Sequence, residues 1–90
     1  MRDGKVESVI RAAKIIECLA NNASARSLVE VAREVGLHVA TTRRLLMTLK
    51  DVEFVSQIEE NKKYSLGLRI LLIAKRASYS LDLRQVSLPY

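Results

Sequence analysis

The sequence contains few of the residues that support disulfide or metal chemistry. Its 90 residues include one cysteine and one histidine. One cysteine excludes an internal disulfide and a cysteine-cluster metal site, so it indicates a reducing compartment. We expect Cys18 to be a small residue of the core or of an interface. His38 is a solitary histidine and a poor metal-ligand candidate, and we expect neither a metal nor a cofactor.

Long apolar segments are also missing. The longest uninterrupted apolar run, Ile70–Ala74, is far too short to cross a bilayer, and the N-terminal MRDGKVES lacks the apolar stretch of a secretory signal. We therefore expect a soluble, cytoplasmic protein with no membrane partner. The chain also has no glycine-rich phosphate loop, no Cys–His pair at a sensible spacing and no carboxylate pair in a plausible cleft, which argues against an enzyme.

What the chain does have is an excess of positive charge. Fifteen Lys and Arg residues against ten Asp and Glu give a net charge of +5. This balance favours an anionic partner such as nucleic acid. Hydrophobic residues make up 49% of the chain, which is enough for the modest core of one compact domain.

Residues 27–49, SLVEVAREVGLHVATTRRLLMTL, have the pattern of a helix-turn-helix. Ser27 can cap the first helix and Glu30 can return a hydrogen bond to its amide, which predicts a capping box. Ala32 is small where two crossing helices must approach, and Gly36 can adopt the positive φ of a tight turn. We expect the second helix over residues 38–50.

This second helix is amphipathic. One face, which Thr42 joins, is apolar at helical spacing and is expected to pack inward: Leu45, Leu46, Leu49 and Val52. The opposite face is expected to be presented to a partner: Ala40, Arg43, Arg44 and Met47.

A scaffold helix precedes the motif. Ser8 is its expected N-cap. Its inward stripe is predicted from spacings of three and four residues, with Ile15 widening it: Val9, Ala12, Ala13, Ile16, Leu19 and Ala20.

After residue 52 the pattern changes to that of a β-hairpin. Residues 54–58 and 63–66 have the alternation and residue types of strands, and residues 59–62 form a polar turn between them. A helix-turn-helix followed at once by a hairpin is the winged-helix arrangement. The sequence therefore predicts a mainly α fold with a small β-hairpin: a three-helix core plus a wing over 54–66, and then a C-terminal linker helix.

A further helix is expected over residues 68–79. It carries more apolar residues than one small core can cover, which argues for a second copy of the chain or for a further domain as partner; packing against the core alone is the alternative. We divide the chain into a DNA-binding domain over 1–79 and a linker helix over 80–90.

The residues that can reach DNA follow from the size of the major groove, which admits one α-helix. Those at the start of the presented helix are His38, Val39, Ala40, Thr41, Arg43 and Arg44. Arg43 is the first choice for a bidentate contact with guanine, and Arg44 suits phosphate. Thr41 suits phosphate or a thymine methyl, and His38 either caps the helix or touches phosphate. Val39 and Ala40 offer only apolar contacts.

The wing tip carries Lys62 and Lys63. They can contact the phosphate backbone beside the groove. Glu59 and Glu60 lie next to them in sequence, so a solvated turn is the alternative.

Several blocks in order resemble the N-terminal DNA-binding domain of the IclR family of transcriptional regulators. They are VESVIRAAKIIECLA, SLVEVAREVGL, TTRRLLMTL, FV before the wing, KYSLGLRILLIA after it and LDLRQVSLPY at the end. The chain departs from the family pattern at His38, Val39 and Ala40, where a small polar or proline-containing segment is usual. It also has Glu53 where the family usually has glycine.

This resemblance implies a repressor or activator that dimerises and binds palindromic operators in double-stranded DNA. It also implies that a small-molecule effector would act only through a C-terminal domain absent here, so we expect the chain to be a piece of a longer protein, with a naturally short protein as the alternative. The competing function is a winged-helix protein-interaction module that docks through the helix over 68–79 and does not bind DNA.

Overall fold

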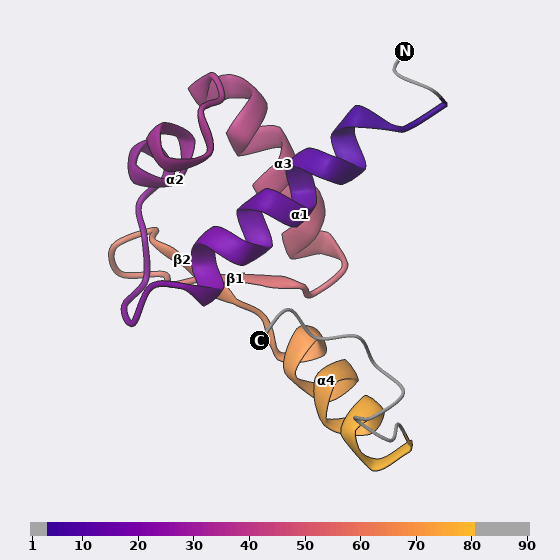
Figure 1. Cartoon of the computed structure of the whole chain (residues 1–90). Helices are drawn as coiled ribbons and strands as arrows, with labels where there is room; N and C mark the ends of the chain where they lie inside the picture. The colour runs from indigo at the N-terminus through magenta and orange to yellow at the C-terminus, as the bar shows by residue number, and fades with distance from the viewer. Residues whose placement is uncertain (1–3, 81–90) are drawn as a thin grey trace.

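The computed structural model describes residues 4–80 and contains a three-helix core, a hairpin and a fourth helix. The elements follow one another as α1 (Glu7–Ala20), α2 (Leu28–Val35), α3 (Val39–Asp51), β1 (Val55–Gln57), β2 (Tyr64–Leu66) and α4 (Leu68–Ser80) (Figure 1). This is the predicted winged helix-turn-helix. The predicted linker helix over 80–90 lies outside the described residues except for its first, and the division of the chain there stays a prediction.

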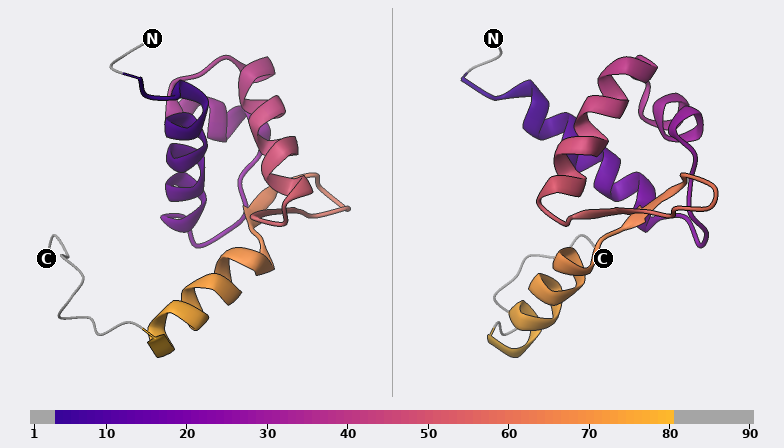
Figure 2. Two further views of the ribbon diagram at one scale, coloured as in Figure 1. Left: turned by 90° about the vertical axis from the view of Figure 1, so that its right-hand side faces the viewer. Right: turned by 180° about the vertical axis from the view of Figure 1, so that it is seen from behind.

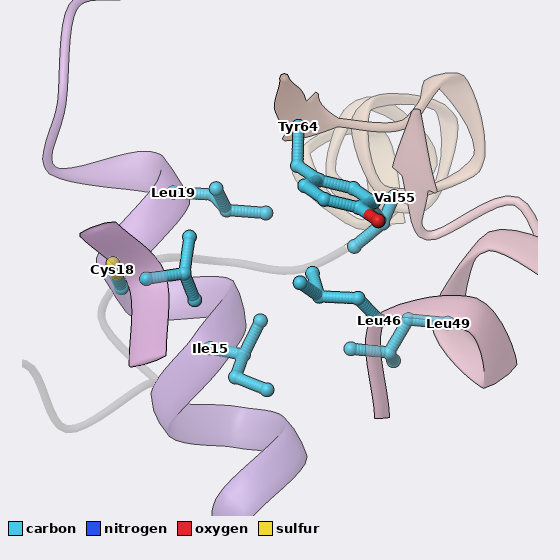
Figure 3. Close-up of a cluster of buried hydrophobic side chains, with 8 residues drawn as sticks. Ile15, Cys18, Leu19, Leu46, Leu49, Val55 and Tyr64 are labelled. Atoms are coloured by element: carbon cyan, nitrogen blue, oxygen red, sulfur yellow. The ribbon is translucent and has the colours of Figure 1, made fainter. Parts of the chain in front are cut away.

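The core lies where α1, α2 and α3 cross above the hairpin. Its buried side chains come from all three helices and from both strands: Ile15, Cys18, Leu19, Val31, Leu46, Leu49, Val55 and Tyr64. Figure 3 shows Leu46 between Ile15 and the ring of Tyr64. The prediction that Cys18 is a core residue is confirmed, because only 4% of it is exposed.

The start of α2 and the turn after it are as predicted. The Glu30 amide donates to Ser27 Oγ at 3.2 Å, and the Ser27 amide donates to Glu30 Oε1 at 2.9 Å, which completes the capping box. Gly36 has φ 72°, and the amide of Leu37 donates to the carbonyl of Ala32 at 3.0 Å. Ala32 itself is buried. This local geometry sets the angle at which α3 leaves α2.

The prediction for α1 is wrong in two respects. The helix begins at Glu7, and Val6 occupies the N-cap position with no side-chain hydrogen bond, so Ser8 is not a cap. The buried face contains Ile15, Cys18 and Leu19, whereas Val9 is 65% exposed. Val9 lines a hollow between α1 and α3, so the first turns of α1 lie at the edge of the core. The predicted members Ala13 and Ala20 are also exposed.

The prediction for the inner face of α3 is right for Thr42, Leu46 and Leu49 and wrong for Val52. The helix ends at Asp51, and Val52 is its C-cap, with φ −95° and ψ 9°. The backbone therefore leaves the helical path there, and the Val52 side chain is 48% exposed.

The wing is a two-stranded antiparallel hairpin in which Val55 pairs with Leu66 and Gln57 with Tyr64. A bridge that periodicity did not reveal extends it. The Arg26 amide donates to the Tyr64 carbonyl at 2.9 Å, and the Tyr64 amide donates to the Arg26 carbonyl at 2.7 Å. The segment before α2 is thereby fixed to the wing.

The fourth helix projects away from the rest of the described chain in both views of Figure 2. It packs mainly against β1. Several of its large apolar side chains remain exposed, which confirms the predicted apolar surplus: Leu68, Leu71, Leu72 and Ile73. Gly67 precedes the helix and is buried, and a Cβ there would clash with the backbone carbonyl of Glu53.

Candidate nucleic-acid interface

Hydrogen bonds from the buried residue Thr42 fix the N-terminus of α3. The backbone amide and the Oγ1 hydroxyl of Thr42 both donate to the His38 carbonyl, each at 2.9 Å, and Thr42 is fully buried. His38 occupies the N-cap position, but its side chain makes no capping hydrogen bond. Thr42 is therefore structural, as predicted, and the His38 ring is exposed beside the first turn.

Outward-facing residues of α3 form what we call the recognition strip: Ala40, Arg43, Arg44 and Met47. All four are exposed, as the periodicity predicted. Within residues 4–80, neither arginine makes an ion pair or a side-chain hydrogen bond. Val39 is also exposed and Thr41 is half-buried. The strip therefore presents two unneutralised guanidinium groups.

Arg43 lies on the side of the strip that faces the wing. It lines a hollow of about 480 Å³ together with residues from the start of α2 and from the wing turn, among them Ser27, Asn61 and Lys62. The Lys50 ammonium donates to Gln57 Oε1 at 3.0 Å, and Gln57 Nε2 donates to the Lys62 carbonyl at 3.1 Å. These bonds hold the wing turn beside α3.

The two wing lysines occupy different surroundings. Lys62 adopts φ 62°, is exposed, and forms an ion pair with Glu59 at 3.4 Å. Lys63 is half-buried and lies near the capping box of α2. Hydrogen bonding to the Ser27 amide lowers the pKa of Glu30, and the charges of Arg26 and Lys63 lower it further. Only Lys62 lines the hollow beside Arg43.

Arg11 is a candidate that the sequence reasoning missed. It is half-buried on α1 and lines two hollows, one of about 570 Å³ with Arg44 and Thr48, and one of about 430 Å³ with His38 and Thr41. Its Nε atom is buried without a hydrogen-bond partner among the described residues. The sequence offered one signal for Arg11, which is that this arginine lies next to the apolar stripe of the first helix. Arg11 therefore adds a cation beside Arg44, on the side of α3 away from the wing.

Arg26 connects three elements beneath the interface. Its guanidinium donates to Glu34 Oε1 at 3.0 Å on α2 and to Asn22 Oδ1 after α1, while its backbone pairs with the wing. Burial raises the pKa of the Cys18 thiol to about 11, and the nearby Glu34 carboxylate acts in the same direction. The thiol therefore stays neutral at ordinary pH and serves packing.

Residues 4–80 contain no group of three or more His, Cys, Asp or Glu side chains that could hold a metal ion. None of the helices within that range is long and apolar enough to span a membrane.

The three-helix core and the hairpin define a winged helix-turn-helix domain, a fold typical of DNA-binding domains, and α3 carries an exposed basic strip. Comparison with known proteins agrees with this. The IclR helix-turn-helix domain matches residues 8–59. The transcriptional repressor IclR of Escherichia coli K12 is 30% identical over 86 residues, which are 96% of this chain and 31% of the repressor.

Solved structures are similar as well. HmgR of Pseudomonas aeruginosa matches with a TM-score of 0.78 and 30% identity over 89% of this chain and 33% of its own. The Zα domain of Carassius auratus PKZ, solved in complex with Z-DNA, matches with a TM-score of 0.60 and 27% identity over 68% of this chain and 98% of its own.

The chain belongs to the IclR helix-turn-helix family. It spans about a third of the length of the curated relatives it matches. These matches do not favour the alternative of a protein-interaction module without a DNA role. Glu53 adopts φ 66°, a left-handed conformation that favours glycine, so the connection between α3 and β1 is strained.

Proposed function

We propose that this chain binds double-stranded DNA sequence-specifically as the reading domain of an IclR-type transcriptional regulator, acting by binding rather than catalysis. The observation that carries the proposal is the recognition strip, where Arg43 and Arg44 stand exposed and unpaired within the described chain. α3 enters the major groove and the wing lies beside it. The family relatives named as repressors and the Zα domain bound to Z-DNA support this proposal.

Arg43 is proposed to read guanine and Arg44 to bind phosphate. A guanidinium can donate two hydrogen bonds to O6 and N7 of guanine, and each such pair contributes about 1–3 kcal/mol of discrimination. Thr41 is half-buried beside Arg11, which suits a phosphate contact better than a base contact. His38 is proposed to touch phosphate at the first turn. Val39 and Ala40 offer apolar contacts to the groove.

Phosphate contacts are proposed on both sides of α3. Lys62 faces the hollow beside Arg43, and Arg11 lies between His38, Thr41 and Arg44 on the other side. Lys63 contributes long-range attraction more than contact, since Glu30 and the capping box are close to it. Cations on both sides suit the two strands that border a major groove.

A homodimer on a palindromic operator is part of the proposal. The exposed apolar side chains of α4, such as Leu71 and Leu72, offer a surface that a second copy can cover. A dimer doubles the contacted bases, which a domain of this size needs for useful specificity. We place its action in the cytoplasm, as a repressor or activator, with any small-molecule effector bound by a domain outside this chain.

The test is selection of bound duplexes from a randomised pool, followed by a salt titration of binding to the selected duplex. We expect affinity to fall steeply with salt, because each neutralised phosphate releases counterions. Arg43→Ala should relax preference at one position of each half-site. Arg33→Ala, which removes an exposed arginine of α2 outside both flanking hollows, is the control and should keep the preference. Binding that ignores salt, or an unchanged preference in Arg43→Ala, would contradict the proposal.

A further inference from the structure

The recognition strip has an apolar side chain at each end. Ala40 and Met47 are both exposed, and Met47 is 49% exposed although it is a large hydrophobic residue. Met47 belongs neither to the core nor to the partly buried residues packed against it. Core packing therefore does not explain why a methionine stands at this position, one turn beyond the two arginines.

The spacing brings Met47 within reach of the same groove. Ala40, Arg43, Arg44 and Met47 stand at i, i+3, i+4 and i+7, which places them on one face of α3. At a rise of about 1.5 Å per residue, the strip is about 10.5 Å long. That length corresponds to about three base pairs of B-DNA. In homeodomains, the helix that lies in the major groove contacts bases over a strip with this same spacing.

A methionine in the groove discriminates among base edges by what it lacks. Its thioether cannot donate a hydrogen bond and accepts only weakly, so a polar base edge opposite it loses water without a replacement. Thymine alone among the four bases presents an apolar group in the major groove, its C5-methyl. A flexible, unbranched side chain adapts well to such a contact.

We propose that Met47 is a specificity-determining residue that contacts the C5-methyl of a thymine, one helical turn along the groove from the base read by Arg43. The proposal rests on the proposed function and deepens it, because it names a base that the half-site must contain. It also assigns a contact to a residue that the sequence analysis placed on the presented face without giving it a role.

The test uses the selected duplex with each thymine replaced in turn by uracil, which removes only the methyl group. For the wild-type chain we expect one uracil position in each half-site to weaken binding about fourfold, the equivalent of one buried methyl group. Met47→Ala should weaken binding to the thymine duplex by a similar factor. Uracil at that position should then cause no further loss of binding, whereas its effect at other positions should stay as in the wild type. Val52→Ala removes a similarly exposed side chain just after the end of α3, outside the recognition strip and the apolar face of α4, and is the matched control for uracil sensitivity.

Met47→Gln gives a second readout that does not depend on lost affinity. Glutamine can donate to N7 and accept from N6 of adenine, so selection with this variant should replace the thymine by adenine at the same position. The inference is overturned if no uracil position weakens wild-type binding, or if Met47→Ala keeps the wild-type sensitivity. Either result with retained selective binding leaves the proposed function standing, whereas absence of duplex binding at low salt overturns both.

Discussion

Two helices of equal length, α3 and α4, show how differently this chain uses its apolar residues. Each has 13 residues. α3 buries Leu46 and Leu49 in the core and leaves its arginines outside, whereas α4 leaves Leu71 and Leu72 exposed and packs mainly against β1. Packing within this chain is thus enough to stabilise α3, whereas the exposed apolar face of α4 needs a partner to cover it. The described chain thus consists of a three-helix core with its wing, which packs on itself, and a projecting helix, α4.

The strongest way to break this comparison is to truncate a leucine in each helix. Leu46 is fully buried, so Leu46→Ala should lower the free energy of unfolding by about 2–5 kcal/mol through lost transfer energy and a new cavity. In the monomer, Leu72→Ala should change it by less than about 0.5 kcal/mol, because the side chain is half-exposed and packs on no core residue. Urea unfolding followed by circular dichroism measures both. Equal losses would show that α4 is part of the core.

The junction between the two helices offers the next test. A Cβ at residue 67 would meet the backbone of Glu53, Phe54 and Val55, which cannot move aside as a flexible side chain could. Gly67→Ala should therefore destabilise the chain by about 1–3 kcal/mol. Gly4→Ala is the control, because nothing lies near its Cβ position. Its positive φ of 78° gives it only a local cost. Equal unfolding midpoints for the two variants would contradict the close approach.

The pH dependence of stability tests the burial of Cys18 in the core. The pKa of its thiol is about 11 in the folded chain against 9.0 for a free thiol, so the folded state holds the proton more tightly. Its stabilising contribution is therefore complete below pH 9 and is lost as the pH rises towards 11. We expect the wild-type chain to lose more stability across that interval than Cys18→Ala, measured by thermal unfolding. Parallel pH profiles would contradict this.

Glu53 gives the smallest expected effect. It adopts φ 66°, which costs a residue with a side chain about 1–2 kcal/mol relative to glycine. Glu53→Gly should gain a few tenths of a kcal/mol, because the greater freedom of glycine in the unfolded chain offsets much of the relief. The exposed ion pair with Arg69, at 3.8 Å, contributes little. Glu53→Ala keeps the strain and removes the pair, so it should not gain stability in the same denaturation assay.

Some parts of the fold were predictable because they depend on residues close together in the chain. The capping box of Ser27 and Glu30, the positive φ of Gly36 and the two-residue alternation of the wing are all local patterns. The inner and outer faces of α3 followed from helical spacing for the same reason. These predictions were confirmed by the structure, except that Val52 lies beyond the end of α3 and is exposed.

Other parts were not predictable, because they depend on where the helices cross. Periodicity marked Val9 as apolar, but the core begins further along α1 and leaves Val9 at the edge of a hollow. Arg11 became a site candidate only because α1 passes beside the N-terminus of α3. Lys63 has a neighbour in Glu30 that no sequence spacing indicates.

The sequence by itself determined the reading unit: a capped helix, a glycine turn and an amphipathic helix that presents Arg43 and Arg44. Local backbone preferences and helical spacing are enough for that, since both act within a few residues. Only the tertiary structure decided which cations lie beside α3 and which apolar residues remain uncovered. Those outcomes depend on packing between distant segments, such as the bridge from Arg26 to Tyr64 and the contact between Gly67 and Glu53.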